Sequence, residues 1–92
     1  MGKSIMQDEK CSYLNGDTRA LHKHHIYAGS NRKASEKHGF WVWLTPRQHN
    51  MSDEGVHFNK DLDLKLKREC QAKFEETHSR EDFIKIIGKS YL

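Results

Sequence analysis

The sequence predicts a small α+β domain, in which a two-stranded ribbon and a short helix are backed by two longer helices. Three observations support this class. Residues 40–44 (Phe-Trp-Val-Trp-Leu) are aromatic and β-branched, which is typical of a short strand. Thr45-Pro46 supplies a helix N-cap followed by proline at the first helical position. Apolar residues then recur every four positions between Leu62 and Phe74, which indicates one face of a helix.

The first half of the domain is expected to hold both strands. The first strand is placed within residues 20–27, and the polar residues 30–39 are predicted to be a loop. The short helix is expected to run from residue 46 to about residue 54. Trp41 and Trp43 alternate along the second strand, so we expect one to face the core and the other to be covered by a C-terminal helix.

Two helices are expected in the C-terminal part. Asn59 is placed as the cap of a helix that runs from residue 60 to about residue 76. Ser79 is placed as the cap of the last helix, which ends at Gly88. The buried face of the longer helix is predicted to hold Leu62, Leu66, Cys70 and Phe74.

The chain of 92 residues is the size of one domain. Residues 1–10 are polar and aperiodic, so we expect a flexible N-terminal arm followed by a single domain over residues 11–92. Two cysteines do not make a disulfide scaffold. We see no apolar run that would span a membrane and no signal peptide, so a cytoplasmic protein with no membrane partner is expected.

Positive charge is concentrated in the first half of the chain. Residues 1–50 carry eight Lys or Arg against four Asp or Glu, and five of the seven histidines. A basic, histidine-rich half favours a polyanion such as DNA as partner, although a solvated surface is the open alternative. The candidate phosphate contacts are Arg32, Lys33, Lys37 and Arg47.

Histidines supply the candidate chemistry. His24 and His25 lie at the end of the first strand, where neighbours point to opposite faces unless a twist brings both to one pocket. His49 lies about one turn into the short helix, with Asp53 on the same helical face, and His57 follows soon after. Three imidazoles, with a carboxylate as a further donor, would suffice for one divalent ion with open positions.

Three segments together resemble phage-encoded HNH endonucleases of the ββα-metal class. They are residues 24–26 (His-His-Ile), 43–50 (Trp-Leu-Thr-Pro-Arg-Gln-His-Asn) and 55–59 (Gly-Val-His-Phe-Asn). The resemblance covers residues 11–92. It implies a ββα-metal domain with two C-terminal packing helices, hydrolysis of DNA phosphodiester bonds with one divalent ion (Mg, Mn, Ni or Zn), and a place in the bacterial host cytoplasm.

The resemblance also implies a role for each histidine. His24 and His49 match metal ligands, and His25 matches the general base that activates water. His57 matches the last histidine of the motif, which is a metal ligand or a phosphate contact. A histidine bound to metal through its accepting nitrogen cannot also take a proton there, so the adjacent pair must divide the two roles.

Two departures from the family pattern stand out. Many relatives hold a structural zinc with four cysteines, and the matching positions here are Cys11, Leu14, Thr45 and Gln48. With three of the four ligands absent, we expect no structural zinc bound by cysteines. The middle asparagine of the motif is also missing, because Phe40 stands about where it is expected.

Two classes of function therefore remain. The retained histidines favour a metal-dependent DNA endonuclease. The lost zinc ligands and asparagine favour a non-catalytic phage anti-defence protein, for instance an anti-CRISPR, that binds its target on an HNH-derived scaffold. The small size fits either class and makes a homodimer or a protein partner plausible.

Overall fold

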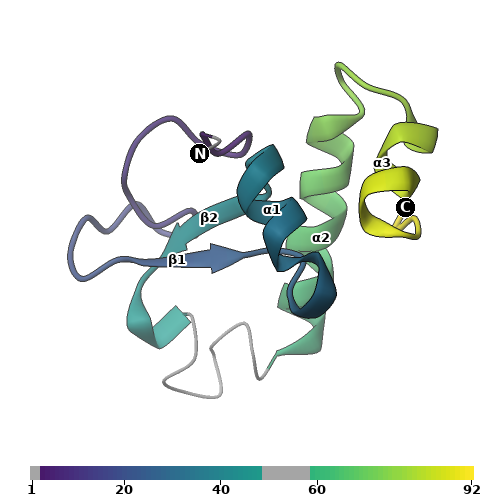
Figure 1. The fold of residues 1–92 in the computed structure, drawn as a ribbon. Coiled ribbons are helices and arrows are strands. Elements are labelled where there is room, and N and C mark those ends of the chain that lie inside the picture. The colour runs from purple at the N-terminus through teal and green to yellow at the C-terminus, as the bar shows by residue number, and fades with distance from the viewer. Residues whose placement is uncertain (1–2, 49–58) are drawn as a thin grey trace.

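The computed structural model describes residues 3–48 and 59–92. Its elements are β1 (His22–His25), the 3-10 turn η1 (Gly29–Asn31), α1 (Arg32–His38), β2 (Trp41–Leu44), α2 (Lys60–Phe74) and α3 (Arg80–Ile87). The two strands form an antiparallel ribbon, α1 lies beside it, and α2 and α3 stand together at one end (Figure 1). The predicted α+β class is confirmed. Neither described part of the chain contains a helix with the length and apolar composition of a membrane span.

The first strand is shorter than predicted. The ladder pairs His22 with Leu44 at one end and His25 with Trp41 at the other. Ala20 has a φ of 51°, which an extended strand does not allow, so regular pairing begins only after it.

The prediction of a loop over residues 30–39 is wrong, because most of this segment forms α1. Its fully buried residue is Ser35, whose hydroxyl donates to the Tyr27 carbonyl at 2.7 Å and accepts from the Tyr27 N–H at 3.2 Å, and beside it Ala34 packs against the core. Gly39 ends the helix with a φ of 77°, the left-handed conformation that favours glycine. A helix that packs through a serine has no apolar periodicity to reveal it.

Side chains of β2 alternate between two faces of the ribbon. Val42 and Leu44 are fully buried against the helices, in a core with Phe40 and the inward residues of α2 and α3. Trp41 and Trp43, two positions apart, share the opposite face, which we call the outer face, with their rings 5.3 Å apart and nearly perpendicular. The expectation that the two tryptophans face different sides is therefore wrong.

The C-terminal helices begin where predicted. The side chain of Asn59 accepts a hydrogen bond from the Leu62 N–H at 3.1 Å, and that of Ser79 accepts one from the Asp82 N–H at 3.1 Å. The four-residue apolar repeat of α2 faces the core as predicted, with Leu66, Cys70 and Phe74 buried and Leu62 packed against them. Burial raises the pKa of the Cys70 thiol to about 12, so this thiol stays protonated.

The N-terminal segment lies along the free edge of β2. The Ser4 hydroxyl donates to the Trp41 carbonyl at 2.5 Å, and the Gln7 side-chain oxygen accepts from the Trp43 N–H at 2.8 Å. The Ile5 N–H donates to the Gly39 carbonyl at 2.9 Å. Side chains thus cover an edge that would otherwise expose unpaired backbone groups. The boundary between arm and domain at residue 10 stays a prediction.

Gly39 provides the first test of this packing. It has a positive φ, and a Cβ there would collide with the Lys3 carbonyl oxygen, whereas Gly16 has a similar φ of 79° with open space around it. Gly16→Ala is expected to cost about 1 kcal/mol of unfolding free energy from backbone strain alone. Gly39→Ala is expected to cost about 1–3 kcal/mol more, measured by urea unfolding. Equal losses in the two variants would contradict the close packing of the arm.

His38 makes stability depend on pH. Its ring stacks 5.7 Å from that of Phe40, and burial, with the charges of Lys37 and His78, lowers its pKa below the ordinary 6.5. Between the two pKa values the unfolded chain binds more protons than the folded one, so stability falls as the pH drops below about 6.5. Unfolding free energies at about pH 8 and about pH 5 should differ less in His38→Gln than in the parent. An equal acid loss in both would assign the effect to another group.

Candidate functional site

The two adjacent histidines of β1 lie on opposite faces of the ribbon. The ladder places His24 opposite Val42 and His25 opposite Trp41. Directly opposed residues of an antiparallel pair point to the same face. His24 therefore lies on the core side, only 3% exposed, whereas His25 lies on the outer face. The two imidazoles diverge instead of meeting in one pocket.

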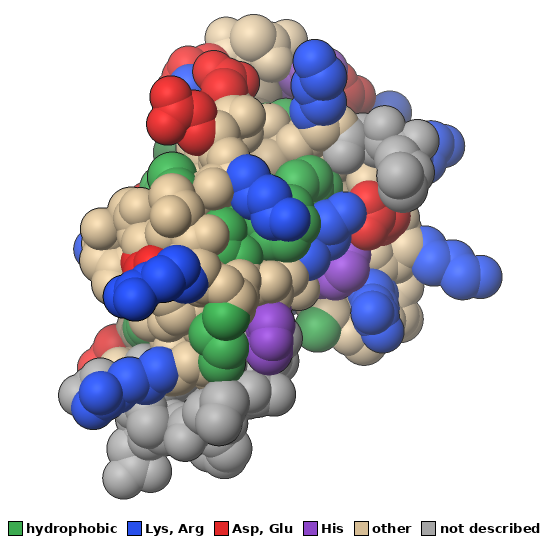
Figure 2. All heavy atoms as spheres, turned by 90° about the vertical axis from the view of Figure 1, so that its left-hand side faces the viewer, with side chains coloured by type: hydrophobic (Ala, Val, Ile, Leu, Met, Phe, Trp, Pro, Cys, Tyr) green, Lys and Arg blue, Asp and Glu red, His purple; other side chains and the backbone are tan. Residues whose placement is uncertain are grey.

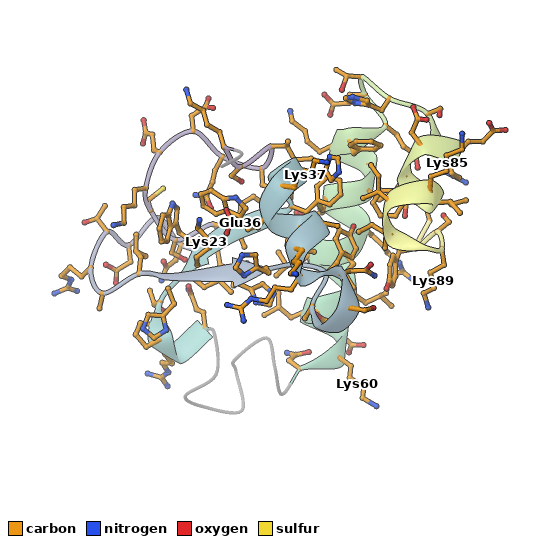
Figure 3. The ribbon with its side chains drawn as sticks, viewed as in Figure 1. Lys23, Glu36, Lys37, Lys60, Lys85 and Lys89 are labelled. Atoms are coloured by element: carbon orange, nitrogen blue, oxygen red, sulfur yellow. The ribbon has the colours of Figure 1, made fainter. Side chains whose placement is uncertain are left out.

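A carboxylate from α1 holds His25. The His25 Nε2 lies 2.9 Å from a Glu36 oxygen. The Lys23 ammonium lies 3.3 Å from both oxygens of the same carboxylate, and Figure 3 shows Lys23 and Glu36 side by side. The hydrogen bond from His25, followed by that from Lys23, holds the pKa of Glu36 below its ordinary value. In the neutral tautomer with its proton on Nε2, His25 donates to this carboxylate and keeps Nδ1 as an acceptor. The arrangement is that of an imidazole oriented by a carboxylate.

The outer face combines aromatic rings with lysines. The Lys23 ammonium lies 4.2 Å from the centre of the Trp41 ring, and the Lys10 ammonium lies 4.8 Å from that of Trp43. Figure 2 shows hydrophobic side chains gathered on this side of the molecule with Lys and Arg side chains across them. A hollow of about 560 Å³, which we call the outer hollow, is lined by Lys3, Ser4, Gln7, Asp8, Glu9, Lys23, Trp41 and Trp43.

The candidate DNA contacts fall on two elements. Arg32, Lys33 and Lys37 are exposed on α1, not on a loop as predicted. Arg47 is exposed in the helical turn that follows β2. The helix places Lys33 and Lys37 one turn apart on the same helical face.

Hydrogen bonds join the two turns where the resemblance places the zinc ligands. The Ser12 hydroxyl donates to the Gln48 side-chain oxygen at 2.5 Å, and the Thr45 N–H donates to the same oxygen at 3.0 Å. The Thr45 hydroxyl in turn accepts from the Gln48 N–H at 3.3 Å, which caps the helical turn at Pro46 as predicted. We call this contact between residues 11–14 and 45–48 the turn junction. It brings the positions matched to the four cysteines into two adjoining turns.

Much of the predicted metal site lies outside the described residues. His49, His57, Asp53 and the remainder of the short helix fall there. Among residues 3–48 and 59–92, no three His, Cys, Asp or Glu side chains are gathered as metal ligands would be. Of the predicted metal ligands, His24 is the one that lies among the described residues. Its imidazole is a donor type that Mg, Mn, Ni and Zn accept to different degrees.

Sequence reasoning missed Glu36 and Ser12. Glu36 is the only acidic residue between Asp17 and Asp53, so it is the only carboxylate of that stretch available to the histidine pair. This isolated position in the sequence was the signal that could have identified Glu36 as the partner of a histidine. Ser12 carried no signal, because a hydroxyl next to Cys11 has no distinctive pattern.

Fold and site together define a small α+β domain with a two-stranded antiparallel sheet and a histidine held by a carboxylate beside it. Comparison of the chain with protein-family models, curated proteins and solved structures gives no match.

Proposed function

We propose that this protein is a divalent-metal-dependent DNA endonuclease of the HNH, ββα-metal type. The observation that carries the proposal is the orientation of His25 by the Glu36 carboxylate, which lies 2.9 Å from its Nε2. A nuclease of this type needs one member of the histidine pair for the metal and the other to activate water. Its place of action would be the cytoplasm of a bacterial host.

His25 acts as the general base in this proposal. With its Nε2 proton donated to Glu36, its Nδ1 accepts a proton from the attacking water. The negative carboxylate also stabilises the imidazolium that this transfer creates. Glu36 thus positions the base and offsets its charge without touching the substrate.

His24, His49 and His57 would hold the single divalent ion. Of these three, His24 is the one that the structure describes, with its imidazole buried on the core side of β1. A bound divalent ion would supply charge stabilisation for the phosphate and for the leaving oxygen. The exposed cations Arg32, Lys33, Lys37 and Arg47 would neutralise DNA phosphates.

The turn junction is consistent with the resemblance independently of the histidines. An alignment with a four-cysteine zinc site requires residues 11–14 and 45–48 to lie together. Here they meet through Ser12 and Gln48. In our proposal these hydrogen bonds take the place of the structural zinc.

One observation favours the second candidate function, a non-catalytic phage anti-defence binder. Phe40, which stands where the family asparagine is expected, is fully buried in the core and cannot position a catalytic loop through hydrogen bonds. In that case a protein partner or a homodimer would use the same surface without cleavage.

Histidine variants test the two functions together. Nicking of supercoiled plasmid is measured with magnesium, manganese, nickel or zinc, beside titration of the metal. His25→Ala is expected to lose about 10²–10⁴-fold in rate while it binds metal as the parent does. His49→Ala is expected to lose metal binding, and activity with it.

An exposed histidine in the turn between α2 and α3 supplies the matched control. His78→Ala should cut at the parent rate, because His78 lies outside the proposed site. A His25→Ala protein that cuts like the parent would refute the mechanism. A parent protein that cuts with none of the four metals would refute the endonuclease and leave the binder as the candidate function.

Restored cysteines test the resemblance without any cleavage. In the triple variant Leu14→Cys, Thr45→Cys, Gln48→Cys, four thiols including Cys11 would face one another across the turn junction. We expect this protein to bind one zinc or cobalt ion, detected by cobalt–thiolate absorption, and to melt at a higher temperature with metal than without. Adding Cys11→Ser should weaken the binding. A triple variant that binds no metal would contradict the alignment of these turns with the zinc site.

A further inference from the structure

The outer hollow adjoins the proposed base. Lys23 lines the hollow and also binds Glu36, which in turn holds His25. All three lie on the face of the ribbon that carries Trp41. A substrate whose reacting phosphate reached His25 would therefore have its neighbouring nucleotide at the hollow.

The lining of the outer hollow matches a nucleotide in its chemistry. Trp41 and Trp43 give aromatic surface, and Lys3 and Lys23 give ammonium groups. Two carboxylates, Asp8 and Glu9, lie in the same wall; they would repel a bare phosphate but accept hydrogen bonds from the N–H groups of a base. The volume of about 560 Å³ lies within the range of small-ligand sites.

Lys10 contacts the ring of Trp43 in a way that a nucleotide base could replace. Its side chain is exposed and its ammonium rests 4.8 Å from the ring centre. Little structure is disturbed if a base takes its place on the ring. The displaced ammonium would then be close to the phosphate of the nucleotide that displaced it.

We propose that the outer hollow binds an unstacked nucleotide of single-stranded DNA, with its base on Trp43 and its phosphate against Lys10 and Lys3. In a duplex the faces of each base are covered by its neighbours, so the hollow selects single-stranded or extruded nucleotides. The inference deepens the proposed function and rests on it for the position of the cut next to the hollow.

Tryptophan fluorescence reports directly on this site, because the only two tryptophans of the chain both line it. A single-stranded oligothymidylate is titrated into the protein in EDTA, where no metal-dependent cleavage can occur. We expect quenching of the emission and an affinity that falls as salt rises. Blunt-ended duplex DNA without unpaired bases should quench far less.

Paired variants locate the binding. Trp43→Ala is expected to weaken it by about tenfold or more, and Trp43→Phe by much less, because phenylalanine retains an aromatic face. Lys10→Gln should weaken binding, whereas Lys85→Gln, which removes an equally exposed lysine from α3 at the other end of the molecule (Figure 3), should not. Lys10→Gln keeps the test valid if Trp43→Ala fails to fold.

The inference is overturned if oligothymidylate leaves the fluorescence unchanged, or if Lys10→Gln and Lys85→Gln weaken binding equally. These experiments distinguish failure of this inference from failure of the proposed endonuclease function. If the protein nicks plasmid but shows no quenching, the proposed endonuclease function stands and the nucleotide site in the outer hollow is refuted. If quenching depends on Trp43 and Lys10 but the protein never cuts DNA, the nucleotide site stands and the endonuclease function is refuted.

Discussion

The alternation of side chains along β2 determines where the other parts of the molecule lie. Phe40, Val42 and Leu44 point to one side and are fully buried, so α2 and α3 must pack there. Trp41 and Trp43 point to the other side, where the N-terminal segment and Lys23 cover them in part. The same alternation, transmitted across the ladder, separates the adjacent histidines of β1. One local rule thus fixes both the core and the division of the candidate site.

The sequence was informative wherever structure follows from local physics. The caps at Asn59 and Ser79 and the apolar repeat of α2 were predicted because each is a contact within one or two helical turns. α1 was missed because its packing contact is the Ser35 hydroxyl, which binds the backbone of a residue eight positions away. Side chains two positions apart on a strand point to the same face, so the expectation that Trp41 and Trp43 face different sides conflicts with strand alternation itself. The roles of His24, His25, His49 and His57 stay predictions.

The turn junction joins two turns through hydrogen bonds alone. A tetrahedral zinc fixes four ligands at once, whereas the side-chain oxygen of Gln48 here accepts from the Ser12 hydroxyl and from the Thr45 N–H. Two hydrogen bonds to one oxygen also connect two turns, and each contributes about 1 kcal/mol rather than the large free energy of metal binding. More of the stability must then come from the core. The dense aromatic packing of Phe40 with Phe74 and Phe83 is consistent with this.

Glu36 connects the two halves of the outer face, because a single carboxylate serves both Lys23 and His25. Lys23 also lies over Trp41, so its ammonium is shared between a ring and a carboxylate. Lys23, Glu36 and His25 therefore form one connected group of side chains on the outer face. Glu36 belongs to α1, the helix that the sequence pattern did not reveal, which is why this connection could be found only in the folded structure.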